Sequence, residues 1–192
     1  MMIYLASQSP RRAELLRQIG VEYEVYVSDI DERRLASESP DEYVCRMAET
    51  KARVALSEIV KTQDSCVVLA ADTTIELDGD IIGKPADRSH CHCILQKLSG
   101  RQHQVLTAVA LATTQRLEFR LTRNQVRFRN LTQGEIDAYC ATAEPIDKAG
   151  AYAIQGKAAV FVEQLEGSYS AVMGLPLLET AELLSNAAIE IF

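Results

Sequence analysis

The sequence predicts an α/β fold in which a mixed β-sheet is flanked by helices. Segments with the alternating or continuous apolar character of strands take turns with segments whose apolar residues recur at helical spacing. Two long strands, predicted over 103–112 and 116–128, follow one another, and long paired strands among helices favour a mixed sheet over a purely parallel one. A chain of 192 residues is long enough for one sizeable core or for two small lobes around one cleft.

The first elements along the chain are a strand, a helix and a second strand. Residues 3–6 form a short apolar segment, and Pro10 suits the first turn of a helix because its missing N–H would have no partner there. Apolar residues recur at helical spacing over 13–19, and Gly20 favours the end of this helix. Residues 23–27 alternate in polarity as a strand does.

A capping box predicts the start of the next helix. Ser39 and Glu42 have the spacing at which each side chain binds the backbone N–H of the other residue, so a helix is expected over about 40–60. The apolar run over 67–75 is typical of a central strand buried on both faces. An Asp-Gly pair at 78–79 then predicts a tight hairpin turn, after which the chain returns alongside this strand.

The remaining elements follow from the same two periodicities and from capping residues. They are a helix over about 87–98 that ends at Gly100, the two long strands, a helix from Thr132 to about Cys140, a strand near 160–165 and a final helix over 176–186. The sequence has no linker-like stretch, low-complexity tract or internal repeat, so a single domain over 1–192 is expected.

The overall charge limits the classes of partner. The formal net charge is −7, whereas general nucleic-acid binding depends on a broad basic surface, so no nucleic-acid partner is expected. A small anionic ligand is compatible with an acidic protein, because a few clustered cations create a positive pocket. The first residues lack the regions of a signal peptide, and no apolar run approaches membrane-spanning length. We therefore expect a cytoplasmic protein without a membrane partner.

The five cysteines are expected to be reduced thiols. Their number is odd and their spacing is not that of a disulfide framework, as is usual in a cytosolic protein. The run Cys91-His92-Cys93 invites a zinc site. Cys91, however, shares a predicted helical stripe with Ile94 and Leu98, so its two neighbours point elsewhere. No second Cys/His pair completes a tetrahedral ligand set, and a zinc site is not expected.

The segment over 7–12 has the composition of an anion site. It places two hydroxyls and two guanidinium groups at the start of the first helix, where unpaired backbone N–H groups point outward. This arrangement suits a phosphate chain, although an exposed basic turn and a kinase site are alternatives. The predicted phosphate-binding residues are Ser7, Ser9, Arg11 and Arg12.

Two charged residues lie within apolar patterns. Lys51 falls in the apolar stripe of the helix over 40–60, where a lysine either extends to the rim or reaches a partner in a cleft. Asp72 interrupts the apolar run over 67–75, and an ionised carboxylate there is costly unless it is paired or bound to a metal. The alternative for Asp72 is that the strand reaches the surface at this position.

The predicted hairpin brings a third charged residue toward Asp72. A two-residue turn at 78–79 sets Asp72 opposite Pro85, so Lys84 lies within a residue or two of Asp72. Residues 79–85 superficially resemble a phosphate-binding Walker A loop. This segment is one residue short, however, and ends in proline where Ser or Thr should bind Mg²⁺, so we reject that interpretation.

The loop over 147–156 is rich in small residues and glycine. Such a backbone is suited to a close approach to a ligand, although an ordinary surface loop has a similar composition. Within it, Gln155 carries one donor and one acceptor group with which to read the edge of a nucleobase.

Together these segments resemble the Maf (septum-formation) family of nucleoside triphosphate pyrophosphatases. The matching segments occur in the family's order over nearly the whole chain, at 5–12, 49–52, 71–73, 83–85, 147–152, 155–156, 167–169 and 174–176. The resemblance implies a single Maf-like domain, with a mixed α/β fold similar to that of inosine triphosphate pyrophosphatases and a cleft between two lobes. It also implies hydrolysis of a nucleoside triphosphate to the monophosphate and pyrophosphate, with a divalent metal as cofactor.

The resemblance further assigns residues to roles. Asp72 corresponds to the family's proton acceptor, and Lys51 and Lys84 join it as catalytic candidates that supply positive charge. The residues implied to set substrate choice are Arg11, Thr73 and Gln155, which match the dTTP/UTP subgroup. For Mg²⁺ or Mn²⁺ the expected protein ligands are Glu32 and Asp72, although the acidic run that ends at Glu32 is equally compatible with an exposed turn.

Other functions within reach of this sequence are a 7-methyl-GTP-type pyrophosphatase of the same family and a non-catalytic nucleotide-binding regulator of cell division. The 7-methyl-GTP subgroup carries a different set at the three specificity positions. The resemblance implies housecleaning of nucleotide pools as the physiological purpose. Homodimers are common among soluble proteins, but no segment of the sequence indicates an interface, and the oligomeric state stays open.

Overall fold

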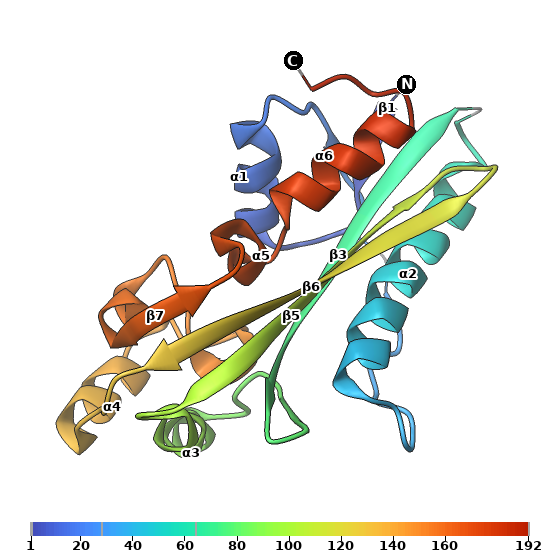
Figure 1. The fold of residues 1–192 in the computed structure, drawn as a ribbon. Coiled ribbons are helices and arrows are strands. Elements are labelled where there is room, and N and C mark those ends of the chain that lie inside the picture. The colour runs from blue at the N-terminus through green and yellow to red at the C-terminus, as the bar shows by residue number, and fades with distance from the viewer. Residues whose placement is uncertain (1, 28, 64, 192) are drawn as a thin grey trace.

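A mixed β-sheet forms the centre of the computed structural model, which describes residues 2–27, 29–63 and 65–191 (Figure 1). Within these residues seven strands form one sheet in the order β2-β1-β3-β5-β6-β7, with β4 paired to β3. The strands are β1 (Met2–Leu5), β2 (Glu24–Val25), β3 (Cys66–Leu77), β4 (Asp80–Ile82), β5 (Gln102–Ala112), β6 (Leu117–Phe128) and β7 (Val162–Glu166). β1 runs parallel to β2 and β3, whereas β4, β5, β6 and β7 pair antiparallel with their neighbours, which confirms the predicted mixed sheet.

Helices cover both faces of this sheet. They are α1 (Pro10–Gln18), α2 (Pro40–Ile59), α3 (Arg88–Leu98), α4 (Gln133–Cys140), α5 (Tyr169–Met173) and α6 (Leu177–Asn186), with short 3₁₀ segments η1 (Ala149–Ala151) and η2 (Lys157–Phe161). Figure 1 shows α2 on one side of the long strands β3, β5 and β6, and α1 and α6 on the other. α3 and α4 lie near the lower left end of the long strands in Figure 1, away from α1 and α6.

Among the residues that the structure describes, the buried ones form three clusters, and these clusters define two lobes. In the first lobe, α2 packs residues such as Val44 on one face of the sheet, and α1 and α6 pack Leu16 and Leu183 on the other. In the second lobe, α3 and α4 pack against the far ends of the long strands, around residues such as Leu95 and Phe128. The long strands pass through both lobes and therefore hold them in a fixed relation.

The capping and turn residues act as the sequence predicts. Ser39 Oγ accepts a hydrogen bond from the N–H of Glu42 at 3.2 Å, and the Glu42 carboxylate accepts one from the N–H of Ser39 at 2.8 Å. This capping box starts α2. Asp78 and Gly79, with φ of 57° and 86°, form the two-residue turn between β3 and β4, a conformation that Asp-Gly pairs favour.

Two strands are shorter than the sequence predicts. The strand expected over 23–27 pairs with β1 only at Glu24–Val25, opposite the last two residues of β1. The strand expected near 160–165 begins at Val162, because η2 occupies the preceding residues. Neither change moves a predicted site residue.

The short helix α5 was not predicted. It has five residues, which is less than two turns and too few for a helical periodicity to be visible in the sequence. Ser168 caps its start by accepting from the N–H of Ala171, and Gly174 ends it with φ of 117°. The left-handed conformation at the end of a helix favours glycine.

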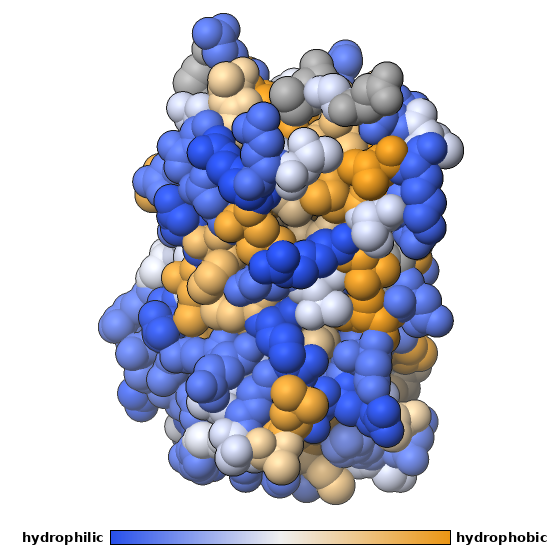
Figure 2. Space-filling model, turned by 90° about the vertical axis from the view of Figure 1, so that its right-hand side faces the viewer, coloured by the Kyte–Doolittle hydropathy of each residue, from blue (hydrophilic) through white to orange (hydrophobic). Residues whose placement is uncertain are grey.

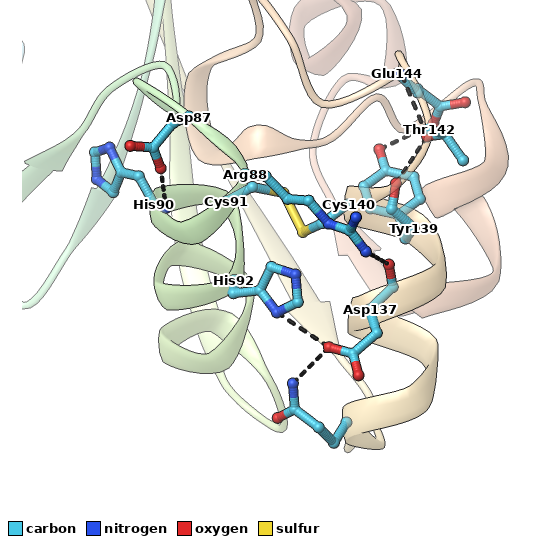
Figure 3. Close-up of a disulfide and its surroundings, with 11 residues drawn as sticks. Asp87, Arg88, His90, Cys91, His92, Asp137, Tyr139, Cys140, Thr142 and Glu144 are labelled. Atoms are coloured by element: carbon cyan, nitrogen blue, oxygen red, sulfur yellow. Dashed lines mark hydrogen bonds and ion pairs between the residues drawn. A yellow bond between two sulfur atoms is a disulfide. The ribbon is translucent and has the colours of Figure 1, made fainter.

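The prediction that all five cysteines are reduced is wrong. Cys91 of α3 and Cys140 of α4 form a disulfide, with 6.1 Å between their Cα atoms (Figure 3). The sequence spacing gave no sign of this pair, because its members are 49 residues apart and meet only when α3 and α4 pack together. The other three cysteines, Cys45, Cys66 and Cys93, are free.

Among the described residues, no group of three or more His, Cys, Asp or Glu side chains is arranged so that it could hold a metal ion. Cys91 lies in the buried stripe of α3 with Ile94, Leu95 and Leu98, as its helical spacing predicts. His92 instead pairs with Asp137 of α4, with 3.1 Å between Nδ1 and Oδ1 (Figure 3).

The surface carries hydrophobic side chains in small groups separated by hydrophilic ones on the face shown in Figure 2. The large exposed hydrophobic residues come from many different elements, among them Val160 of η2 and Leu178 of α6. The oligomeric state, for which a homodimer is one expectation, therefore stays open. In the part of the chain that the structure describes, no helix is both long and apolar enough to cross a membrane.

Candidate active site

A cleft of about 1070 Å³ lies between the two lobes and gathers every site residue that the sequence predicts. The predicted residues in its lining are Ser7, Ser9, Arg11, Arg12, Glu32, Lys51, Asp72, Thr73, Lys84 and Gln155. They come from the start of α1, the segment before α2, α2 itself, β3, the segment after β4 and the loop after η1.

The cleft opens where one edge of β3 has no partner strand. β1 pairs with residues 66–69 of β3, and β4 pairs with residues 75–77. Between them, residues 70–74 pair with β5 on one side but with none of the described strands on the other. Asp72 and Thr73 lie in this interval, so both side chains reach the cleft from the middle of a rigid strand.

Asp72 lies in a cluster with one lysine and a second carboxylate. Lys51 Nζ is 2.7 Å from Asp72 Oδ1 and 2.7 Å from Glu32 Oε1. The side chains of Lys51 and Asp72 are only 15% and 14% exposed, so Lys51 does not extend to the rim and β3 does not surface at Asp72. Glu32 is 49% exposed but is bound to Lys51, which argues against a merely exposed acidic turn.

Charges in and around this cluster shift the pKa values of Glu32 and of the neighbouring Tyr43. Burial opposes the ionisation of Glu32, but the hydrogen bond and charge of Lys51, with the charges of Lys84 and Arg12, lower its pKa below the ordinary value. Tyr43 donates its hydroxyl to the backbone oxygen of Glu32 at 3.1 Å. Burial and the nearby carboxylates raise the pKa of Tyr43 to about 12, so it stays a neutral donor.

Arg12 is held by the protein on all three nitrogens. Nε donates to the oxygen of Gly174 at 2.7 Å, Nη1 to Ser7 Oγ at 3.1 Å and Nη2 to Thr73 Oγ1 at 3.3 Å. Burial lowers its pKa, and the charge of Asp72 works in the opposite direction. Three of its five N–H groups are used in these contacts, which leaves two for a ligand in the cleft.

The start of α1 presents two hydroxyl groups to the cleft, those of Ser7 and Ser9. Ser9 is the N-cap residue, but its hydroxyl makes no capping bond, and its own N–H donates to Ser7 Oγ at 3.1 Å. Pro10 opens the helix as predicted. The arrangement of two hydroxyls at a helix N-terminus beside Arg11 suits an anion.

Lys148 is a cation of the cleft that sequence reasoning missed. It lies in the predicted small-residue loop and lines the same cleft as Arg11. Burial lowers the pKa of Lys148, and the charge of Arg11 lowers it further. The proximity of two cations is unfavourable without a ligand and favourable with an anionic one. In the sequence, Lys148 stood in the glycine-containing loop over 147–156 and in a segment that matches the family, but no role was assigned to it.

The loop that carries Lys148 and Gln155 is tied to the β3–β4 hairpin. The N–H of Gly150 donates to the oxygen of Gly83 at 3.0 Å, and a Cβ on Gly150, which has φ of 68°, would collide with Ile75. Lys84 therefore reaches the cleft next to this loop, although the β3–β4 pairing ends at Ile75 and Ile82 and does not extend to Asp72.

Glu144, a residue without a role in the sequence analysis, fixes the far end of the loop. Its carboxylate accepts from the N–H groups of Lys157 and Ala158 and from the hydroxyl of Tyr139. These bonds hold Gln155, which is exposed and lines the cleft, between two anchored points.

Two carboxylates of the cleft have the chemistry of a site for a hard divalent cation. Glu32 Oε1 and Asp72 Oδ1 both lie 2.7 Å from Lys51 Nζ, so the two carboxylates converge on one positive charge. Mg²⁺ is usually bound through one or two carboxylates, with substrate phosphates and water as the other ligands, and the donor set here fits that pattern.

The family model for "Maf-like protein" matches residues 2–187 of the chain. The chain belongs to the Maf-like protein family. It is 51% identical to a dTTP/UTP pyrophosphatase from Aromatoleum aromaticum, covering 96% of this chain and 94% of the relative. It is 50% identical to a dTTP/UTP pyrophosphatase from Escherichia coli K12, covering 96% and 92%.

The fold of this Maf-like chain is shared with a solved structure of low sequence identity. The Staphylococcus aureus Ham1 protein superposes over 98% of both chains with a TM-score of 0.50 and 15% identity. This similarity concerns the fold alone.

Proposed function

We propose that this chain is a nucleoside triphosphate pyrophosphatase that hydrolyses dTTP and UTP to the monophosphate and pyrophosphate. The names of its relatives, which match it along nearly their whole length, support this activity. The observation that carries the proposal is the Asp72 carboxylate beside Lys51, in a cleft that also holds Arg11, Arg12 and Lys84. A site that only bound an anion would gain nothing from a carboxylate at its centre.

The phosphate chain of the substrate is expected to bind along the cationic wall. Lys51, Lys84 and Lys148 provide point charges, while Arg11 and the two remaining N–H groups of Arg12 provide directed donors. The hydroxyls of Ser7 and Ser9 add neutral donors at the start of α1. Together they offset the charge of the triphosphate.

The proposed chemistry is attack of water on the α-phosphorus. The water oxygen forms a bond to phosphorus while the bond from phosphorus to the oxygen of the departing pyrophosphate breaks, and that oxygen takes the electron pair. Asp72 orients the water and accepts its proton. Lys51 fixes Oδ1 of Asp72, so the carboxylate is already oriented when the substrate enters.

We further propose that the reaction uses Mg²⁺ or Mn²⁺, with Glu32 and Asp72 as the protein ligands. Such an ion, when bound, neutralises negative charge on the phosphates. Lys51 contacts both carboxylates, so it would share with such an ion the neutralisation of their charge.

The base of the substrate is expected to meet the loop over 147–156. Thymine and uracil present carbonyl groups next to an N3–H. The amide of Gln155 offers both donor and acceptor for such an edge. Arg11 and Thr73 line the same cleft and complete the proposed specificity set.

The test is a product assay. The purified protein is incubated with Mg²⁺ and each of the common nucleoside triphosphates and 7-methyl-GTP, and the products are separated by anion-exchange chromatography. The proposal expects monophosphate and pyrophosphate from dTTP and UTP. Diphosphate as product would indicate cleavage at the γ-phosphate, preference for 7-methyl-GTP would indicate the other subgroup, and binding without turnover would indicate a regulator.

The proposed biological setting is the cytoplasm, where nucleotide pools are maintained. There the enzyme would remove non-standard pyrimidine nucleotides. Deletion of the gene is expected to raise the level of such nucleotides in a cell extract, and unchanged levels would contradict this role.

A further inference from the structure

Behind Thr73 lies a buried hydroxyl that the proposed mechanism does not use. Thr107 on β5 is the direct partner of Thr73 in the sheet, and it is fully buried. Thr107 Oγ1 is 2.8 Å from the backbone oxygen of Ala171 in α5 and 3.1 Å from Thr73 Oγ1. Thr73 Oγ1 also receives a hydrogen bond from Arg12 Nη2 at 3.3 Å.

The direction of these bonds follows from the number of hydrogen atoms. A hydroxyl has one hydrogen, and a carbonyl has none, so Thr107 donates its hydrogen to Ala171. The bond between the two threonine hydroxyls must then be donated by Thr73. Since a guanidinium only donates, Arg12 occupies one lone pair of Thr73. The one remaining position on Thr73 Oγ1 can only accept.

This polarity decides what Thr73 can bind in the cleft. Phosphate oxygens at neutral pH accept hydrogen bonds and do not donate them, so Thr73 is not suited to the phosphate chain. The donors of a pyrimidine nucleotide such as UTP or dTTP are on its nucleoside moiety, namely the N3–H of the base and the ribose hydroxyls. Within the cleft, Thr73 contacts Arg12, which binds Gly174. The neighbouring Asp72 instead contacts Lys51 of α2, so the two side chains have different partners.

We propose that Thr107 is a positioning residue that makes Thr73 an obligate hydrogen-bond acceptor, and that this acceptor selects substrates whose nucleoside moiety presents an N–H or O–H donor. The inference rests on the proposed function and adds a physical basis for selectivity. Thymine and uracil carry N3–H, whereas the N3 of cytosine is an acceptor that would face the lone pair of Thr73. A buried polar group left without its complement disfavours the wrong substrate strongly.

The network that orients Thr73 also fixes its surroundings. Thr122 Oγ1 donates to the backbone oxygen of Thr107 at 3.1 Å, and Asn124 accepts from the N–H of Ser168, the N-cap of α5. Beyond this N-cap, the backbone oxygen of Ala171 is bound by Thr107 and that of Gly174 by Arg12. Thr73 therefore cannot easily rotate to present its hydrogen to a substrate.

The experiment compares substrates with and without the donor. The kcat/KM of UTP is measured against that of CTP, which lacks N3–H, and against that of 3′-O-methyl-UTP, whose ether oxygen accepts but does not donate. The Thr107→Val variant keeps the side-chain shape and frees the hydrogen of Thr73, which then serves an acceptor on the substrate. We expect one of the two UTP-to-analogue ratios to fall by about tenfold, the effect of one hydrogen bond.

Controls separate positioning from damage to the fold. Thr107→Ser keeps the hydroxyl and should keep both ratios of the wild type. Thr122→Val removes a neighbouring buried hydroxyl without touching Thr73 and should do the same. If Thr107→Val does not fold, as judged by circular dichroism, the smaller Thr107→Ala variant takes its place.

The outcomes are distinct. A fall in the UTP-to-CTP ratio supports reading of the base, and a fall in the UTP-to-3′-O-methyl-UTP ratio supports reading of the ribose. If both ratios are unchanged in a folded Thr107→Val protein, the inference is overturned. If the wild type does not hydrolyse UTP at all, it is the proposed function that fails, and the two failures are therefore distinguishable.

Discussion

The ammonium nitrogen of Lys51 lies 2.7 Å from Oδ1 of Asp72 and so joins α2 to β3 across the floor of the cleft. Both side chains are largely buried, and each would be costly to bury alone. Asp72 sits on a strand that is fixed by β5, and Lys51 sits in the middle of a 20-residue helix. The pair is therefore oriented by the rigid part of the fold rather than by a loop, as a catalytic carboxylate requires.

The first prediction concerns Asp72→Asn. An amide of the same shape cannot accept the proton of the attacking water, so kcat with UTP should fall by about 10²–10⁴-fold. The rate is measured by pyrophosphate release, and folding by circular dichroism. Asp80→Asn on the exposed strand β4 is the matched control and should retain full activity. Near-normal turnover of a folded Asp72→Asn protein would remove the assignment.

The second prediction concerns the proposed metal. Chelation of divalent ions should abolish turnover, and Mg²⁺ should restore it. Glu32→Gln removes one proposed ligand, so the Mg²⁺ concentration for half-maximal activity should rise by about tenfold or more. Binding of Mn²⁺ to the protein, followed by electron paramagnetic resonance, should weaken in parallel. Asp31→Asn, whose carboxylate pairs with Arg33 at the surface, should leave both readouts unchanged. An unchanged Mg²⁺ requirement in Glu32→Gln would exclude Glu32 as a ligand.

Much of the fold could be predicted from short sequence patterns such as capping boxes and turn residues. The capping box of Ser39 and Glu42 and the turn at Asp78 act within a few residues, so their effect does not depend on the rest of the chain. The candidate site was also indicated by the sequence, because Lys51 and Asp72 interrupt apolar patterns, but only their burial in the structure excludes a lysine at the rim and a strand that surfaces at Asp72.

The remaining features depend on contacts between distant segments. Cys91 and Cys140 meet only after α3 packs on α4, and Thr107 stands behind Thr73 only in the observed register of β5 against β3. A shift of one residue in that register would turn Thr107 away from Thr73. Helix α5 is set by Ser168 and Gly174 rather than by a periodic pattern, so its place in the network had no sequence signal.

The third prediction concerns the disulfide. Denatured protein that has not been reduced should show three titratable thiols per chain, whereas five are expected after reduction. The bond closes a loop of 49 residues, and its loss in Cys91→Ser/Cys140→Ser should lower the free energy of unfolding by about 2–4 kcal/mol. Chemical denaturation measures this change, and the exposed Cys93→Ser is the control. Five thiols before reduction would mean that the bond does not form in solution.

His103 is buried behind the cleft and provides a test by pH. Its Nε2 is 2.8 Å from the hydroxyl of Tyr152, its ring packs edge-on against Phe128, and Nδ1 has no hydrogen-bond partner among the described residues. Burial lowers the pKa of His103 to about 4. The folded protein therefore keeps this ring neutral at a pH where the unfolded chain protonates it.

The fourth prediction follows from that difference. As the pH falls below about 6.5, the unfolded state takes up a proton that the folded state does not, so His103 should lower the free energy of unfolding by about 2 kcal/mol between pH 6.5 and pH 4.5. Glu38, whose pKa Arg46 lowers to about 2, also begins to lose its stabilising contribution at the acid end of this window and loses most of it below pH 4.5. In His103→Gln, which keeps a polar group near Tyr152, the decrease over the same window should be smaller by the His103 contribution, and only the part due to carboxylates such as Glu38 should remain. Urea unfolding of both proteins at several pH values measures the slope. Equal slopes would show that His103 is protonated as readily in the folded protein as in the unfolded chain.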